Sequence, residues 1–455
     1  MKHTSIRASL IVYYPRRAGS VRSGWDVMAA VRSGLRGYIQ GLAALDADIK
    51  RFFVFSLFSN IGIGAFTLLY NLYLVQLGYK EDFIGLFNSA STIALALGAL
   101  LIGRLLNARG SWWTTTYGTA AFVVCSIALA LSTHPITIMI FGALYGIGSG
   151  FVLVTLMPFI VEHVPSRERS TVAAVALSLT SVSATLGSLL GGWTPRLVNV
   201  LLGRHGPSAL GYATALVFSM ILTAVGLVPL FQMRQARWHR LEQTTSLHIR
   251  LDENQHQRQG HFYLIAFVLA GGLLSLGSGA AVPFYNVFLS DIGMRTSQIG
   301  FVYALGNLLG AFFGLFSPPL ARRFGPLGAV SVIRFAPVPL FALLALLPNP
   351  GLAILAHLVR MVSISMAWPI DSTLVADVLP GRLRATAYSW RSAAWNLGWA
   401  GASLVAGRVI VSTGYGPVFL AFCLFTILSI GVMVGVFRTH PAAQRAVSQS
   451  VTPSP

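Results

Sequence analysis

The stretch GIGAFTLLYNLYLVQLGYKEDFIG, residues 62–85, returns 215 positions later as GSGAAVPFYNVFLSDIGMRTSQIG, residues 277–300. Both copies hold a Tyr-Asn pair, a later glycine and a final Ile-Gly in register, and the match continues without a gap to Gly192 and Gly407. Matching halves of about six helices in an apolar chain are typical of transporters that rock one half against the other around a mid-membrane site.

The composition places the chain in a lipid bilayer. Hydrophobic residues make up 55% of it, charged residues 10%, and the mean hydropathy is +0.70, more apolar material than a soluble core can bury. Twelve runs reach the ~20 residues that cross the hydrocarbon, and all are expected to be helices because lipid cannot satisfy an open backbone. The predicted spans are 52–76, 83–106, 112–132, 136–162, 171–200, 208–232, 261–290, 297–320, 327–347, 351–378, 384–411 and 415–437.

The net charge of +19 is arranged by membrane side, which argues against nucleic acid as a partner. With the N-terminus in the cytoplasm, most Lys and Arg fall on that side, and the outer loops hold only Lys80, Arg196, Arg204 and Arg295. This positive-inside pattern predicts that both termini are cytoplasmic. We therefore expect a multi-pass protein of the plasma (inner) membrane, in contact with the lipid bilayer.

The order of these segments predicts the domain organisation. Apolar residues from Val27 to Ile49 recur every three or four positions, as in an amphipathic helix lying on the inner leaflet. The expected parts are a cytoplasmic leader with this helix (1–51), an N-terminal six-helix bundle (52–233), a cytoplasmic linker (234–260), a C-terminal six-helix bundle (261–437) and a disordered tail (438–455).

No residue pattern for catalysis or metal binding is found. Cys125 and Cys423 both fall inside predicted spans, without a CxxC spacing or other ligand types nearby, so neither a disulfide nor a metal site is implied. A nucleophile elbow, a metal-spaced His cluster and a phosphate-binding loop are all missing. We therefore expect no enzyme and no cofactor, and a transporter driven by ion gradients.

The loop between the second and third spans reads Gly-Arg-Leu-Leu-Asn-Ala-Arg-Gly from Gly103 to Gly110. From about residue 46 to 437 the chain resembles the major facilitator superfamily, which has a G-x-x-x-D-R-x-G-R-R type motif at this place. The glycines match, but Asn107 stands where the family has Asp and Ala108 where it has Arg. The resemblance implies an all-α fold of twelve transmembrane helices in two pseudo-symmetric six-helix bundles, and a monomeric transporter of small molecules.

The resemblance also implies which helices line the central cavity. In the family these are helices one, four, seven and ten, so the expected substrate-binding residues include Asn60, Tyr145, Ser278 and Arg360; each could instead satisfy a neighbouring helix. Asn71 and its repeat partner lie near the outer ends of their spans, which indicates a shared structural role rather than substrate binding.

The stretch Gly187-Ser-Leu-Leu-Gly191-Gly192 is similar to the Gly-Pro-x-x-Gly-Gly motif of exporters in this family, without its proline. Small residues that allow close helix packing are the alternative explanation. The motif R-x-x-Q-G of proton-driven drug antiporters is not matched, since Gly142 takes the place of its arginine.

One predicted span, 351–378, carries the charged residues that are hardest to place in lipid. His357, Arg360, Trp368 and Asp371 fall along one face at ~100° per residue, and this face should point to the interior, so Trp368 is a further expected substrate-binding residue. Asp371 lies too far along the helix from Arg360 to pair with it. The natural partner of Asp371 is Arg391 on the next span, either to neutralise a buried charge or to act in coupling and gating.

Arg360 has no acid at its depth anywhere in the sequence. An unpaired cation near the midplane is costly unless water or a negatively charged ligand reaches it, so Arg360 is the best candidate for binding an anionic or strongly polar substrate. The alternative is that it extends outward to the membrane surface or caps backbone carbonyls.

An acid followed three residues later by Pro-x-Arg-x-Arg occurs twice, at Glu162 and at Asp377. The predicted spans place Arg109 beside Glu162, and Arg322 and Arg323 beside Asp377. In the family, such pairs tie helix ends across the cytoplasmic gate and break when it opens. Near water each pair contributes ~0.5–1 kcal/mol, enough to bias a balanced equilibrium; simple anchoring of helix ends is the alternative.

The sequence therefore favours a secondary active transporter that exports a small molecule by proton antiport, with Asp371 or His357 as the titrating group. The alternative is a proton symporter that takes up a polar or anionic solute held by Arg360. A membrane sensor or scaffold is disfavoured because no soluble domain is attached beyond the leader, linker and tail.

Overall fold

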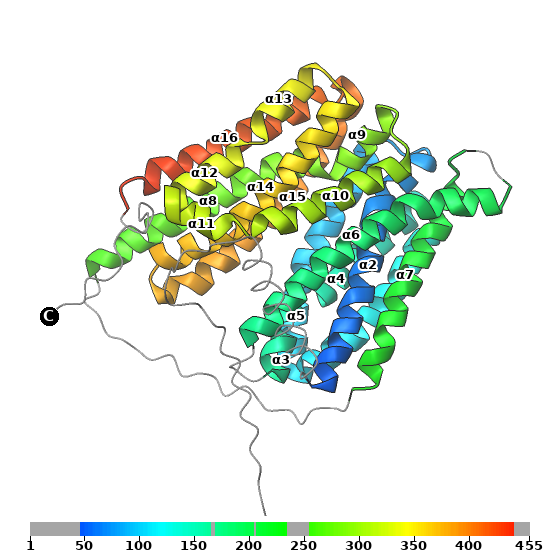
Figure 1. The fold of residues 1–455 in the computed structure, drawn as a ribbon, viewed down its shortest axis with the longest axis horizontal. Helices are drawn as coiled ribbons and strands as arrows, with labels where there is room; N and C mark the ends of the chain where they lie inside the picture. The colour runs from blue at the N-terminus through cyan, green and yellow to red at the C-terminus, as the bar shows by residue number, and fades with distance from the viewer. Residues whose placement is uncertain (1–45, 165–168, 204–205, 234–253, 441–455) are drawn as a thin grey trace, which may run out of the picture.

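The computed structural model describes residues 46–164, 169–203, 206–233 and 254–440, and every regular element in them is a helix (Figure 1). The N-terminal half consists of α2 (Ala47–Gln76), α3 (Glu81–Leu131), α4 (Pro135–Leu153), α5 (Leu156–His163), α6 (Arg169–Leu201) and α7 (Ala209–Phe231). The C-terminal half consists of α8 (Asn254–Ala281), the 3-10 turn η1 (Val282–Phe284), α9 (Tyr285–Asp291), α10 (Thr296–Gly314), α11 (Ser317–Phe324), α12 (Pro326–Phe335), α13 (Val338–Leu346), α14 (Pro350–Val378), α15 (Gly381–Thr413) and α16 (Gly416–Phe437). The all-α prediction is confirmed.

Several of these elements are long and apolar enough to cross a bilayer. Within the described residues there are nine such helices, and the bent pair α10–α11 makes a tenth. Helix α3 counts once although Gly110 divides it, and α15, which carries four arginines, is not among them. With α3 taken as two segments and α15 included, the elements match the predicted spans in order, and the count of twelve stays a prediction.

The helix boundaries depart furthest from the predicted ones at two places. Helix α8 begins at Asn254, inside the predicted linker, and α2 begins at Ala47 rather than at residue 52. Most of the amphipathic helix predicted before the first span and most of the predicted tail lie outside the described residues.

The chain turns in the same way at corresponding places of the two halves. Gly78 and Gly293 both have φ 89°, while Gly110 and Gly325 have φ 79° and 75°. Only glycine adopts these left-handed angles without strain. The register of the repeat is therefore reproduced in the backbone at both pairs of turns.

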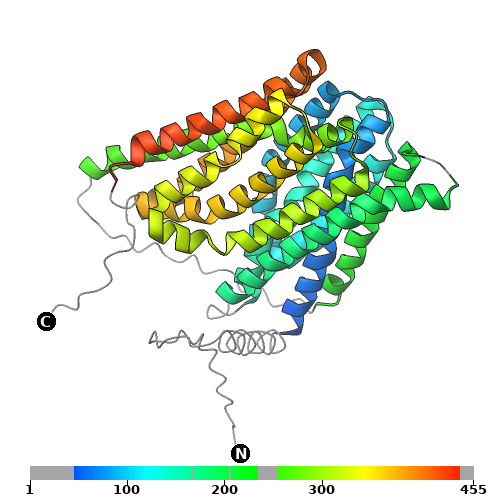
Figure 2. The same ribbon diagram turned by 45° about the horizontal axis from the view of Figure 1, so that its top comes forward.

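The helices gather into two groups, with α2–α7 on one side and α8–α16 on the other (Figure 1). The main contacts between them are α3 with α15 and α6 with α10, and α6 and α10 run side by side in Figure 2 as well. A Cβ added at Gly85 would lie 2.4 Å from the carbonyl oxygen of Ser403, and one added at Gly300 would lie 2.5 Å from that of Ser188. Gly85 and Gly300 are equivalent in the repeat, and so are Ser188 and Ser403. The crossing of α3 with α15 and the crossing of α6 with α10 therefore have the same close backbone contact.

Two hydrogen bonds join the halves in the same reciprocal way. The Asn71 Nδ2 donates to the carbonyl oxygen of Pro283 over 2.6 Å, and the Asn286 Nδ2 donates to that of Leu68 over 2.8 Å. Pro283 is the repeat counterpart of Leu68. The expected structural role of the two asparagines is confirmed.

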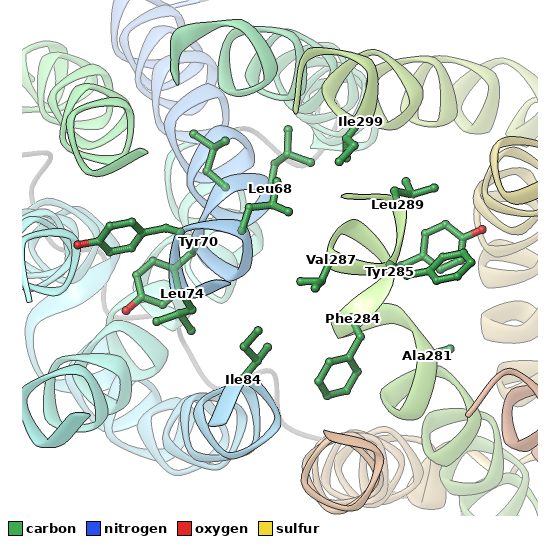
Figure 3. Close-up of a cluster of buried hydrophobic side chains, with 14 of the residues drawn as sticks. Leu68, Tyr70, Leu74, Ile84, Ala281, Phe284, Tyr285, Val287, Leu289 and Ile299 are labelled. Atoms are coloured by element: carbon green, nitrogen blue, oxygen red, sulfur yellow. The ribbon is translucent and has the colours of Figure 1, made fainter. Parts of the chain in front are cut away.

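Buried apolar side chains surround these bonds and come from both halves. Figure 3 shows Leu68 of α2 and Val287 of α9 on the facing sides of their elements, while Tyr70 and Tyr285 point away from one another. Each tyrosine therefore packs into its own half, and aliphatic side chains such as Leu68 and Val287 lie between the two elements.

Candidate functional site

Two cavities are candidates for the site. The central cavity, about 440 Å³, is lined by both halves and includes Asn71, Tyr145, Asn286 and Tyr303. The charged cavity, about 280 Å³, is lined by residues of the C-terminal half alone. Its lining includes Arg334, Arg360, Asp371 and Arg391, together with the aromatic side chains of Trp368, Tyr388 and Trp395. The described lining of the central cavity holds no charged residue, so the charges of the site lie on one side of the molecule.

Asp371 lies between two arginines in the charged cavity. Its Oδ2 is hydrogen bonded to Arg391 Nη2 of α15 and is 3.3 Å from Arg334 Nη2 of α12. The expected approach of Asp371 and Arg391 is therefore present, and Arg334 is a second partner that the sequence did not indicate. Because Asp371 is only 3% exposed, removing the carboxylate would leave two cations facing each other inside the half.

Arg360 has no carboxylate partner among the described residues. It is 5% exposed, its Nη2 contacts the sulfur of Met361 at 3.4 Å, and its Nε has no hydrogen-bond partner. Hydrogen bonds to a charged group are worth ~1.5–3 kcal/mol, so a buried donor without one is costly. Arg360 is one of the residues that line the charged cavity, where a ligand could supply the missing acceptor.

His357 lies one turn before Arg360 and is fully buried. Its ring centroid is 4.2 Å from that of Tyr303 and 5.4 Å from that of Tyr285, and neither ring nitrogen has a hydrogen-bond partner in the described part of the chain. His357 does not line the charged cavity. The helix face that was predicted to point to the interior therefore has two parts. His357 packs in a buried aromatic cluster, while Arg360, Trp368 and Asp371 line the charged cavity.

The remaining expected substrate residues are distributed between the two cavities. Tyr145 lines the central cavity, while Ser278 and Trp368 line the charged one. Asn60 lines neither of these two cavities, and its Nδ2 donates to the carbonyl oxygen of Ser56 in its own helix over 2.7 Å. A substrate role for Asn60 stays a prediction, and the alternative of a bond to a neighbouring helix is not what this hydrogen bond shows.

The first gate pair is not formed. Arg109 stacks over the ring of Trp113 at 4.5 Å, and Glu162 Oε2 accepts a hydrogen bond of 2.9 Å from the backbone N–H of Ser111. Gly110 interrupts the helix just before Ser111, so that N–H belongs to a new helix N-terminus, where a carboxylate is favourable. Within the described residues, Glu162 therefore caps a helix instead of pairing with Arg109.

The second gate pair is also not formed. In the part of the chain that the structure describes, no ion pair joins Asp377 to Arg322 or Arg323, and Arg323 lies 5.4 Å from the ring of Phe324. The gate role of these charges stays a prediction, because such pairs are expected to break when the cytoplasmic gate opens.

The glycines of the exporter-like stretch pack against neighbouring helices. A Cβ at Gly187 would lie 2.4 Å from the carbonyl oxygen of Ile61, and one at Gly192 would lie 2.9 Å from the Cα of Gly300. This close packing was the alternative left open by the sequence, and it accounts for the stretch without reference to transport direction.

A further cross-half contact lies where α3, α9 and α16 come together. The hydroxyl of Tyr415 bonds to Glu81 Oε1 at 3.0 Å and to Asp291 Oδ2 at 2.8 Å. Burial, and then the charges of Asp291 and Glu81, raise the pKa of Tyr415 well above its usual value. The contact adds to the closure of the molecule at the end where Asn71 and Asn286 lie, and no sequence pattern pointed to it.

The known proteins to which this chain is similar are membrane transporters. The model of the Major Facilitator Superfamily matches residues 52–370. The gallate transporter of Pseudomonas putida is 23% identical over 186 residues, which cover 41% of this chain and only 37% of that protein. The lysosomal dipeptide transporter of Pongo abelii is 22% identical over 427 residues, covering 86% of this chain and 87% of that protein.

Solved structures share the fold at low identity. A nucleoside transporter superposes with a TM-score of 0.66 at 16% identity, covering 87% of this chain and 100% of that chain. A D-xylose-proton symporter superposes with a TM-score of 0.63 at 15% identity, covering 89% and 98%. These likenesses show that the chain shares the fold of the two solved structures.

Proposed function

Because the chain belongs to the major facilitator superfamily of membrane transporters, we propose that it moves a small molecule across the plasma membrane by alternating access, driven by the proton gradient. The observation that supports this most is Asp371, a buried carboxylate held by two arginines on a cavity wall. Ionisable groups at such depth are expensive and are typical of proton pathways. A proton bound by Asp371 would remove the charge that both arginines share, so proton binding and the arrangement of the cavity are linked.

Two directions of transport, efflux and uptake, are to be compared. The sequence favoured efflux by proton antiport, but its exporter-like glycines are explained by packing. The unpartnered Arg360 favours the second candidate, uptake of an anionic solute together with protons. Uptake of one negative charge against an inside-negative potential costs ~2.3 kcal/mol per 100 mV. A proton that moves with the anion cancels this cost, so we favour symport.

We propose that the structure represents the conformation open to the cytoplasm. The cross-half bonds of Asn71 and Asn286 lie at the end that the positive-inside pattern assigns to the outside. Reporter fusions after Ser246 and after Arg445 should then report the cytoplasm, and a fusion after Pro135 the outside. An outward report from the Ser246 fusion would contradict this orientation.

The transport proposal is tested with the full chain in proteoliposomes. A pH gradient is imposed, and anionic, neutral and cationic compounds are screened for substrate-dependent collapse of the gradient. We expect an anionic compound to enter together with protons, and the protein with Asp371→Asn to lose the coupled proton movement. A confirmed substrate that moves equally fast with and without the gradient would show that transport is not proton-coupled, and proton movement opposite to substrate movement would establish antiport.

A further inference from the structure

The charged cavity is lined by one arginine, Arg360, that has neither a carboxylate partner nor a hydrogen-bond acceptor for its Nε among the described residues. We propose that it binds an organic monocarboxylate, with the carboxylate on Arg360 and an apolar, ring-bearing body against the aromatic wall of Trp368, Tyr388 and Trp395. This inference rests on the proposed transport function and names the class of its substrate.

The charge distribution selects a single carboxylate. Arg334 and Arg391 already share Asp371, which leaves Arg360 as the cavity's one arginine without an acid in the described part of the chain. Along α14, Arg360 and Asp371 are separated by roughly 16 Å at ~1.5 Å per residue. The two charged ends of the cavity are therefore too far apart for both acid groups of a compact diacid.

The shape of a guanidinium also fits this ligand. A carboxylate can accept two parallel hydrogen bonds from the guanidinium fork, and the Nε of Arg360 is a buried donor that has no hydrogen-bond partner among the described residues. The side chain is 5% exposed, so water competes weakly for these donors. A carboxylate from a ligand would supply what the protein itself does not.

The wall of the cavity fits a ring. Trp368 is 64% exposed although it lines the cavity, so its indole face is open to a ligand. Tyr388 is fixed by its hydroxyl, which donates to the carbonyl oxygen of Ser372 over 2.9 Å. Trp395 lines this cavity, whereas Trp399, one turn later on α15, lines the central one. At about 280 Å³, the space suits a compact molecule of about one ring, near the low end for ligand pockets.

The experiment is equilibrium binding to the purified full chain without any gradient, measured by isothermal titration calorimetry. Benzoate is the probe, and benzamide is its neutral counterpart of nearly the same shape. We expect benzoate to bind about tenfold or more tightly than benzamide, since the ionic hydrogen bonds are made only by the acid. Phthalate, with a second carboxylate on the ring, should bind less tightly than benzoate.

Variants locate the binding to one side chain. Arg360→Gln should weaken benzoate binding about tenfold or more, and Arg360→Lys should retain part of it because the charge is kept. The matched control is Arg408→Gln, an exposed arginine on α15, which should bind benzoate as the unchanged protein does. If Arg360→Gln does not fold, two measurements still test whether a carboxylate binds at Arg360. They are the comparison of benzoate with benzamide in the unchanged protein and the benzoate affinity of Arg360→Lys.

Three results would overturn the proposal: no benzoate binding at millimolar concentration, equal affinity for benzoate and benzamide, or benzoate affinity unaffected by Arg360→Gln in a folded protein. Transport does not enter the measurement. Benzoate binding without proton-coupled movement would therefore refute the transport mechanism alone, and proton-coupled transport of a neutral compound without benzoate binding would refute the anion site alone.

Discussion

Gly300→Val is expected to hold the two halves apart at the end where they now meet. A Cβ at Gly300 would lie 2.5 Å from the carbonyl oxygen of Ser188 and 2.6 Å from the Cα of Gly192. Both are backbone atoms, so no side chain can rotate away and α10 itself must shift from α6. Overpacking costs ~1–3 kcal/mol, and because only the closed arrangement has this contact, the balance of conformations should shift by roughly five-fold to a hundred-fold.

Distances between spin labels at Thr133 and Pro348 measure this shift. Both residues are exposed and lie in loops of opposite halves, and the labels require a protein from which Cys125 and Cys423 have been removed. We expect the distance distribution to move to longer values in Gly300→Val. The matched control is Gly401→Val, because a Cβ at Gly401 meets no atom within 4 Å. An unchanged distribution in Gly300→Val would show that the crossing of α6 and α10 tolerates a side chain without separation of the halves.

Asp371→Asn is expected to destabilise the protein more than any exchange of its partners. Breaking a buried ion pair by removing one side costs ~3–5 kcal/mol, because the other charge stays buried and unpaired. Here two cations, Arg334 and Arg391, lose the same carboxylate. The melting temperature in detergent should fall clearly below that of the unchanged protein.

Adding Arg391→Gln to Asp371→Asn should recover part of the lost stability, and adding Arg334→Gln as well should recover more. The reason is that each step removes one uncompensated charge. If the changes in melting behaviour are simply additive, the three residues do not act as one cluster. Arg408→Gln, an exposed exchange of the same type, controls for loss of an arginine as such.

Features that depend on the type of a single residue, or on its position along the chain, could be predicted from the sequence. The ungapped repeat pairs Gly110 with Gly325, and glycine is the residue that adopts positive φ without strain, so equivalent turns at these two positions were predictable. The spans were recognisable because each must satisfy its own backbone in lipid. The pairing of Asp371 with Arg391 followed from their similar depths in neighbouring spans, since few partners are available there.

Features that depend on how helices pack could not be read in this way. Arg334 lies on α12, and only the rotation of that helix brings it to Asp371. Asn60 was expected at the cavity from its helix number alone, but its amide bonds within its own turn. Glu162 was expected beside Arg109, yet its carboxylate accepts from the backbone N–H of Ser111, and the side chain of Arg109 is exposed.

The reciprocal bonds of Asn71 and Asn286 are of the isologous type known from twofold-symmetric dimers. In such an interface, residue i of one copy contacts residue j of the other, and j contacts i. Here the donor Asn71 and the acceptor Leu68 belong to one half, and their counterparts Asn286 and Pro283 belong to the other. Each half alone therefore carries both the donor and the acceptor, so the surface at which the halves meet is that of a homodimer within one polypeptide. Separation of the halves at this contact must break both bonds, which makes opening at this end a cooperative event.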